Sequence, residues 1–370
     1  VAVRRLIEFL AGYRIPAQVA VRLYRVYGAQ SLERVQEDPY LLAQPQFGAG
    51  FGAADQLALE LGFDGDDARR VEAGVIFELR HNLTNGHTFL PQDKLVAATS
   101  QLLSLEAEPV IAAVDRLTEL GRVEHSTIAG IAAVYLPEYY EAETAIAARI
   151  RAMAQHPPAP LPDAERVLQG IEAIAGITYA ERQRDAIRMA AERRIMILTG
   201  GPGTGKTTVL SGILTLFSKL GRKTLLAAPT GRAAKRLSEL TGRDAATVHR
   251  LLEAQVSPEN GEMFFARTED EPLECDAVIV DEMSMVDVLL MHSLLEALPQ
   301  EACLVLVGDP DQLPSVGAGN LFSDLIRSGI IPSVCLTEIF RQARQSLIVM
   351  NAHAVNRGEL PVLTAKDRDC

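Results

Sequence analysis

The chain has 370 residues, of which 48% are hydrophobic, and this length exceeds one ordinary core, so two or three domains are expected. No apolar run approaches the ~20 residues that cross a bilayer, which argues against a membrane protein. The formal charge of −12 argues against a protein that coats nucleic acid non-specifically. A local basic groove stays compatible with that charge, so composition alone leaves nucleic-acid binding undecided.

The cysteines and the N-terminus indicate where such a chain works. No Cys-x-x-Cys pair suggests zinc, and Cys303 and Cys335 fall in expected buried strands, where they would be small core residues. The first residue, Val1, is not a methionine, and no signal-peptide pattern follows it, which is typical of a fragment or a processed chain. We therefore expect a cytoplasmic protein.

Residues 1–90 are expected to form short helices separated by Gly-containing turns, as a tandem helix-hairpin-helix-like region. The turn Phe47-Gly48-Ala49-Gly50 has the hydrophobic-Gly-x-Gly pattern of that motif, whose glycines let backbone amides approach a DNA phosphate. Residues 11–23, with Ile15-Pro16 in the turn, resemble a degenerate first copy. The alternative is a plain pair of helices in which glycine only caps a helix end.

Residues 91–155 are expected to form a winged-helix-like unit followed by a connecting helix. The pattern predicts helices at 93–103 and 109–120, strands at 122–124 and 131–136 joined by a turn at 126–130, and a helix at 138–155. Many small α+β units share this pattern. The proline-rich residues 156–163 cannot be helical and predict a stiff linker that marks a domain boundary.

Residues 164–370 show the β-α-β alternation of a parallel sheet covered by helices on both faces. Ligands bind at the carboxyl ends of strands in such sheets, and polar residues follow these strands. The predicted strands are residues 195–198, 224–228, 277–280, 303–307 and 334–336.

A phosphate-binding loop follows the first of these strands. The sequence from Gly200 to Thr207 reads Gly-x-x-x-x-Gly-Lys-Thr, and helical spacing follows it. The glycines let backbone N–H groups cradle phosphate oxygens at the positive end of that helix. Lys206 would reach the β- and γ-phosphates, and the Thr207 hydroxyl would bind Mg²⁺. The alternative is a glycine-rich turn without a ligand. The expected nucleotide-binding residues of the loop are Gly201, Pro202, Gly203, Thr204, Gly205, Lys206, Thr207 and Thr208.

Two carboxylates follow the strand at 277–280. Burying carboxylates at a strand end is costly unless they are used, so Asp281 is expected to hold Mg²⁺ through water. Glu282 is expected to orient and deprotonate the attacking water. An exposed acidic turn is the alternative.

Three further residues are weaker candidates for the same chemistry. Gln183 precedes the phosphate-loop strand, and its amide can bond both a donor and an acceptor of adenine. Gln312 lies at the next strand end and could sense the γ-phosphate. Arg341 follows the last strand and could stabilise charge on the transferred phosphoryl group. Chemistry alone singles out none of them.

The complete set of motifs, in this order, resembles that of superfamily 1 helicases. The residues within the motifs resemble those of the RecD-like branch that carries an N-terminal helix-hairpin-helix extension. The resemblance covers most of the chain and is most specific over residues 179–357. It rests on Gln183 and on the segments GGPGTGKTT, APTGRAAKRL, ATVHRLL, VIVDEMSMVD, GDPDQLPSVGAG and LTEIFRQ.

The resemblance implies an ATP- and Mg²⁺-dependent DNA helicase that moves 5′ to 3′ on single-stranded DNA, in repair or recombination, as a monomer acting on junctions with 5′ tails. It implies a RecA-like fold for residues 164–370. By this resemblance Gln183 would bind adenine and Arg341 would contact the γ-phosphate. Gln312 would couple ATP hydrolysis to movement along DNA. The residues it places against single-stranded DNA are Pro229, Thr230, Arg232 and His249.

Residues 253–276 form an insertion whose Asn260-Gly261 pair predicts a hairpin. The hairpin resembles the pin with which these helicases split a duplex, and a plain surface hairpin is the alternative. The family's second RecA-like domain is not among these 370 residues, so we expect this chain alone to carry half an ATP site and to unwind poorly.

Two other function classes remain for comparison. A DNA-binding adaptor in which nucleotide only switches conformation would share the same motifs but show no translocation polarity. A signalling GTPase is disfavoured, because Glu282 follows Asp281 where such proteins have Asp-x-x-Gly, and no Asn-Lys-x-Asp guanine reader follows a strand.

Overall fold

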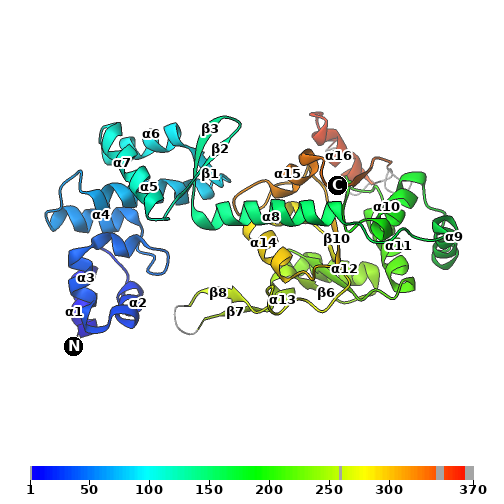
Figure 1. Cartoon of the computed structure of the whole chain (residues 1–370), viewed down its shortest axis with the longest axis horizontal. Coiled ribbons are helices and arrows are strands. Elements are labelled where there is room, and N and C mark those ends of the chain that lie inside the picture. Colours follow the sequence, from blue (N-terminus) through cyan, green and yellow to red (C-terminus); the bar gives the residue numbers. More distant parts are fainter. Residues whose placement is uncertain (1, 258–260, 339–345, 363–370) are drawn as a thin grey trace. The chain divides into compact units, whose positions relative to one another are not determined.

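The computed structural model describes residues 2–257, 261–338 and 346–362 of the chain. Two compact units divide within helix α8 (Pro137–Gln155), near Glu141, and each is described by itself (Figure 1). The predicted division at residues 90, 155 and 163 stays a prediction. Residues 157–161 have no regular secondary structure.

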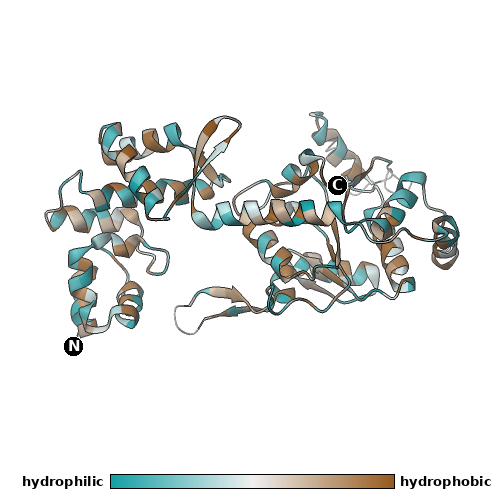
Figure 2. Ribbon diagram, in the orientation of Figure 1, coloured by the Kyte–Doolittle hydropathy of each residue, from teal (hydrophilic) through white to brown (hydrophobic). Residues whose placement is uncertain are grey.

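The first unit begins with short helices, as the glycine-punctuated pattern predicts. Its core holds Leu10, Leu23, Leu42 and Leu57, all fully buried. Helices of this kind carry both apolar and polar residues because only one face is covered, and the ribbon in Figure 2 shows both colours along them. The elements are α1 (Ala2–Ala11), α2 (Ala17–Tyr27), η1 (Gly28–Gln30), α3 (Ser31–Glu37), η2 (Pro39–Ala43), α4 (Phe51–Glu60) and α5 (Ala68–Leu83).

A small α+β segment completes this unit. Strand β3 pairs antiparallel with both β1 and β2, in the order β1-β3-β2. The strand predicted at 122–124 begins later than expected, and the turn contains only Ala129 and Gly130, both with positive φ. Such a two-residue turn matches the twist of the flanking strands, so pairing continues to Ile128. The elements are β1 (Phe89–Pro91), α6 (Gln92–Leu103), α7 (Ala107–Glu119), β2 (Glu124–Ile128) and β3 (Ile131–Tyr135).

The second unit is built on a six-stranded sheet in the order β11-β4-β10-β9-β5-β6, with every neighbouring pair parallel. The order confirms the expected α/β fold. The edge strand β6 was not predicted, because three half-buried residues carry too little pattern. The strands are β4 (Ile195–Gly200), β5 (Thr224–Ala228), β6 (Ala245–Thr247), β9 (Ala277–Val280), β10 (Cys303–Gly308) and β11 (Ser333–Leu336).

Alternate strand residues enter two separate cores, one on each face of the sheet. Ile195 and Ile197 pack with helix α14 (Val288–Ala297), whereas Met196 and Leu198 pack with helices on the other face. Both faces are therefore apolar, which explains why β4, β9 and β10 are buried along their whole length. The remaining helices are α9 (Ala164–Ala175), α10 (Glu181–Glu192), α11 (Lys206–Lys219), α12 (Gly231–Thr241), α13 (Val248–Leu251), η3 (Met283–Met285), α15 (Leu321–Ser328) and α16 (Leu347–Asn356).

The two strand cysteines differ. Cys303 is buried as predicted, but Cys335 is exposed, so its assignment to the core was wrong. Strand β11 lies at the sheet edge, and its burial alternates. Cys335 falls on the open side of that alternation.

Candidate nucleotide-binding site

The phosphate loop joins β4 to α11 at the carboxyl edge of the sheet. Gly203 and Gly205 have φ of 75° and 86°, which side-chain-bearing residues rarely adopt. A Cβ on Gly200 would lie 2.9 Å from the Leu336 carbonyl oxygen, so the loop passes too close to β11 for any larger residue. Helix α11 begins directly at Lys206, which leaves its first-turn N–H groups available to an anion.

Lys206 folds back on its own loop. Its Nζ donates hydrogen bonds to the Gly200 carbonyl and, at 3.2 Å, to the Gly201 carbonyl. Burial lowers the pKa of Lys206, while the nearby carboxylates of Asp309 and Asp281 act in the opposite direction. A partly desolvated ammonium group held only by neutral carbonyls would gain from a phosphate in the loop.

Asp281 and Glu282 follow β9 and share the same edge. Burial raises the pKa of both carboxyl groups, and the Asp281 charge raises that of Glu282 further. Among the described residues, neither has an ion-pair partner within 4 Å. Glu282 has a φ of 55°, a left-handed backbone conformation that is unfavourable for a glutamate. Two uncompensated carboxyl groups beside a lysine fit the expected catalytic pair.

Gln183 lies on α10 and is only 4% exposed. Its Oε1 accepts a hydrogen bond from the Ala180 N–H at 3.0 Å, but its buried Nε2 has no partner among the described residues. A small cavity beside it is lined by Ala180, Arg182, Thr204, Leu336, Thr337 and Glu338. A buried amide donor that lacks an acceptor fits a purine nitrogen, and the role of Gln183 at adenine stays a prediction.

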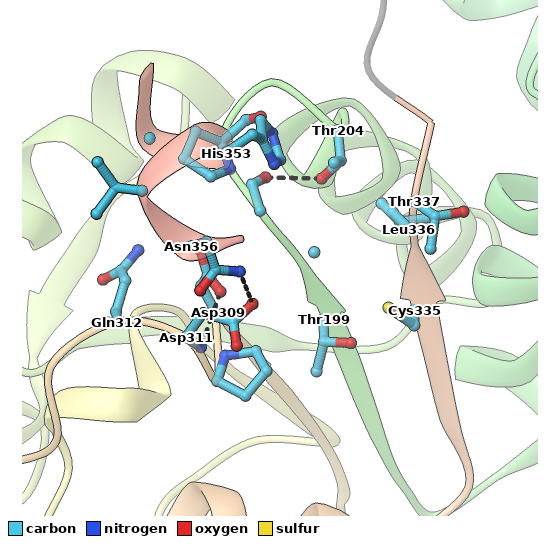
Figure 3. Close-up of a pocket in the computed structure, with 16 residues that line it drawn as sticks. Thr199, Thr204, Asp309, Asp311, Gln312, Cys335, Leu336, Thr337, His353 and Asn356 are labelled. Carbon is cyan, nitrogen blue, oxygen red and sulfur yellow. Dashed lines mark hydrogen bonds between the residues drawn. The ribbon is translucent and has the colours of Figure 1, made fainter. Parts of the chain in front are cut away.

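A cavity of about 390 Å³ opens beside the phosphate loop (Figure 3). One wall is the loop itself, and a second is Asp309, Pro310, Asp311 and Gln312, which follow β10. Asp309 is 3% exposed, and its carboxylate accepts the N–H of Asp311 at 3.1 Å, whereas the Gln312 side chain is exposed to the cavity. The predicted γ-phosphate sensor therefore lies beside the predicted phosphate loop.

The third wall is α16, which sequence reasoning missed. His353 Nε2 lies 3.0 Å from the Pro202 carbonyl oxygen, and Asn356 Nδ2 donates to Asp311 at 2.7 Å. No local motif marks either residue, because the loop is about 150 positions away in sequence. Arg341, expected at the same site, lies outside the described residues.

Residues that could hold Mg²⁺ are oxygen donors of the expected type. Thr207 is exposed at the start of α11, and Asp281 offers a carboxylate that, among the described residues, accepts only the Glu282 N–H. Within the described ranges no group of three or more His, Cys, Asp and Glu could hold a metal by itself. A hydroxyl and one carboxylate fit an ion whose other ligands are water and phosphate oxygens.

The four residues expected at DNA follow β5 and β6. Pro229 and Thr230 follow β5, and the Thr230 hydroxyl accepts the Ala233 N–H at 3.2 Å as the N-cap of α12. Arg232 is exposed, and the His249 ring lies 5.8 Å from the Phe265 ring. The carboxyl ends of β5 and β6 lie at the same sheet edge as the phosphate loop, so the fold gathers them on one side of the sheet. Their contact with DNA stays a prediction.

The inserted hairpin has two short paired strands, β7 (Ala254–Val256) and β8 (Met263–Phe265). Gly261 has a φ of 76°, consistent with the predicted turn, whose residues 258–260 lie outside the described ranges. Val256, Met263 and Phe264 are 67%, 56% and 46% exposed. Exposed apolar side chains add little to a core and are typical of a contact surface, and the pin role of the hairpin stays a proposal.

Parts of the chain are similar to known proteins. Residues 1–89 match the model described as the ATP-dependent RecD2 DNA helicase HHH domain, and residues 183–318 match the AAA domain. The ATP-dependent RecD2 DNA helicase of Deinococcus radiodurans is 36% identical over 368 residues, which cover 97% of this chain and 50% of that protein. The chain is therefore similar to RecD-like DNA helicases over nearly its whole length.

Other relatives agree with this RecD-like assignment. The RecBCD enzyme subunit RecD of Mycolicibacterium smegmatis is 37% identical over 217 residues, or 52% of this chain and 37% of that protein. The crystal structure of Pif1 helicase from Candida albicans gives a TM-score of 0.35 at 23% identity, over 50% of this chain and 45% of that one. The chain spans about half the length of the curated relatives it matches, or less.

Proposed function

We propose that the protein containing this RecD-like chain is an ATP-dependent DNA helicase that moves 5′ to 3′ along single-stranded DNA, in repair or recombination. The observation that carries the proposal is the meeting of Lys206, Asp281 and Glu282 at one sheet edge, beside a loop built for phosphate. Binding of ATP with Mg²⁺, action as a monomer on junctions with 5′ tails, and a cytoplasmic location belong to the same proposal. Within the described residues no helix combines the length and apolar character needed to cross a membrane.

The domain assignment is also a proposal. Residues 1–90 form the helix-hairpin-helix region, 91–155 the winged-helix-like unit with its connecting helix, 156–163 the linker, and 164–370 the first RecA-like domain. The hairpin at residues 253–276 acts as the pin at the DNA junction. The parallel sheet and the match of residues 1–89 support this assignment.

The chain's own residues would act in sequence on ATP. Gln183 would direct its unpartnered amide to adenine, and Lys206 would exchange the Gly200 and Gly201 carbonyls for phosphate oxygens. Glu282 would orient the attacking water and take its proton, for which a raised pKa makes it a better base. Bound Mg²⁺, held by Thr207 and Asp281, would neutralise charge on the transferred phosphoryl group. Gln312 and Arg341 would contact the γ-phosphate and couple its loss to movement on DNA.

Lys206→Ala in the full-length protein tests this function. We expect ATP hydrolysis to fall at least about a hundredfold and unwinding to be lost, while much DNA binding remains. Translocation on 5′-tailed and 3′-tailed DNA should show 5′ to 3′ polarity in the unaltered protein only. Normal unwinding by Lys206→Ala would refute the motor, and hydrolysis without polarity would instead indicate a nucleotide-switched adaptor.

A further inference from the structure

Helix α16 closes the phosphate-loop cavity from a part of the chain that no motif assigns. Its residues Ala352, His353, Val355 and Asn356 line the cavity together with the loop. His353 and Asn356 are three positions apart, so they lie on the same helix face (Figure 3). Each touches a different wall.

His353 binds the phosphate loop. A carbonyl oxygen can only accept, so the His353 Nε2 donates to the Pro202 carbonyl at 3.0 Å. The ring lies so close to the loop that a Cβ on Gly201 would be 2.7 Å from its Cε1. The absence of a side chain at Gly201 is therefore what admits the imidazole.

Asn356 binds the other wall. Its Nδ2 donates to the Asp311 carboxylate at 2.7 Å, and the Asp311 N–H in turn donates to Asp309 at 3.1 Å. Gln312 is the next residue in that wall. The two side chains of α16 thus connect the loop that would hold phosphate to the segment that would sense it.

We propose that α16 is a positioning element of the nucleotide site, in which His353 and Asn356 set the distance between the phosphate loop and the Asp309–Gln312 wall. This inference rests on the proposed ATP hydrolysis at the same loop. The hydrogen bond from Asn356 holds the Asp311 carboxylate, and the Asp311 N–H is bonded to Asp309, so the segment that leads into Gln312 is held from both sides. His353 keeps the Pro202 carbonyl from turning toward incoming phosphate. Neither residue needs to touch the reacting atoms.

Steady-state ATP hydrolysis by the full-length protein with single-stranded DNA tests the inference. Asn356→Ala should lower kcat about threefold to tenfold with little change in KM, the effect of one hydrogen bond. His353→Ala should instead raise KM for ATP by about the same factor. Asn351→Ala is the matched control, because Asn351 lies on the same helix but bonds the Val362 backbone, and we expect it to keep kcat.

Exchanging the two side chains of the Asn356–Asp311 hydrogen bond distinguishes a positioning role from a general loss of stability. Asn356→Asp alone places two carboxylates at a hydrogen-bond distance and should lower kcat more than Asn356→Ala. Asp311→Asn alone keeps an acceptor and should stay near the parent. The double variant Asp311→Asn with Asn356→Asp restores a donor and an acceptor with their positions reversed, so kcat should recover.

Two results would overturn the inference: equal kcat and KM for all α16 variants and the parent, or no recovery in the exchanged pair. Lys206→Ala distinguishes this failure from failure of the proposed function. If Lys206→Ala abolishes hydrolysis while Asn356→Ala and His353→Ala have no effect, only the role of α16 is wrong. If Lys206→Ala hydrolyses ATP normally, the site itself is wrong.

Discussion

In the first unit, the Asp55 carboxylate accepts two hydrogen bonds from Arg70, at 2.8 and 3.1 Å, and one from the Tyr40 hydroxyl at 2.8 Å. Arg70 also donates to the Gly65 and Leu103 carbonyls. In the second unit, Asp281 accepts only the N–H of Glu282 among the described residues, and burial raises its pKa.

The difference separates two uses of a buried carboxylate. Asp55 is compensated by a full charge and a hydroxyl, so its charge holds α4 and α5 together. Asp281 and Glu282 have no ion pair within 4 Å among the described residues, and burial raises the pKa of both carboxyl groups although Lys206 and Arg236 act against that rise. A buried carboxylate without an ion-pair partner therefore indicates a group that acts on a ligand. A buried carboxylate that is fully hydrogen-bonded to a cation indicates a structural role.

The largest expected effect tests the uncompensated pair. Glu282→Gln removes the proposed base while keeping its shape, so kcat for ATP hydrolysis should fall about 10²- to 10⁴-fold. The melting temperature should stay equal or rise, because a desolvated carboxylate is removed. A clear loss of stability with normal kcat would show that Glu282 has a structural role, as Asp55 has, and no catalytic one.

The same kind of change in the first unit should act on stability instead. Asp55→Asn leaves the Arg70 charge buried without its counter-ion, which should lower the free energy of unfolding of that unit by about 3–5 kcal/mol. Denaturant unfolding measures it, with Asp281→Asn as the matched substitution in the second unit. Comparable losses of stability in both variants would show that the two carboxylates are not used differently.

The pH dependence of hydrolysis should report Glu282. Only the deprotonated base accepts a proton, and burial together with the Asp281 charge raises the pKa of Glu282. As the pH is lowered, kcat should therefore begin to fall at a higher pH than it would with an ordinary glutamate, whose pKa is about 4.3. The acid limb should be absent from the residual rate of Glu282→Gln. An unchanged limb in that variant would assign it to another group.

The smallest expected effect concerns a buried hydroxyl group to which no role in the site is assigned. The Thr99 hydroxyl in α6 is fully buried and has no hydrogen-bond partner among the described residues. Thr99→Val keeps the shape and removes the desolvated hydroxyl, so the first unit should gain about 1 kcal/mol. Thermal unfolding would measure the gain, and hydrolysis should not change. A loss of stability would mean that Thr99 has a partner, which would weaken the comparison.

Much of this arrangement follows from local pattern. Every strand of the sheet except β6, the phosphate loop and the carboxylates after β9 were predicted, because glycines, apolar runs and strand-end polar residues each have a local physical reason. The exposure of Cys335 was not predictable, because burial at a sheet edge depends on the absence of a neighbouring strand. The contacts of His353 and Asn356 were missed for a related reason: they join positions far apart in sequence, and no periodicity encodes such distances.

The strand order has a consequence for biosynthesis. Strand β4, which leads into the phosphate loop, has as its two neighbours β10 and β11, and both are encoded more than 100 residues later. A nascent chain must therefore carry β4 with both edges unpaired while β5 and β9 emerge and can already pair. Unpaired apolar strands invite association with other chains, so the segment around residues 195–200 is where chaperone binding during translation would be most useful.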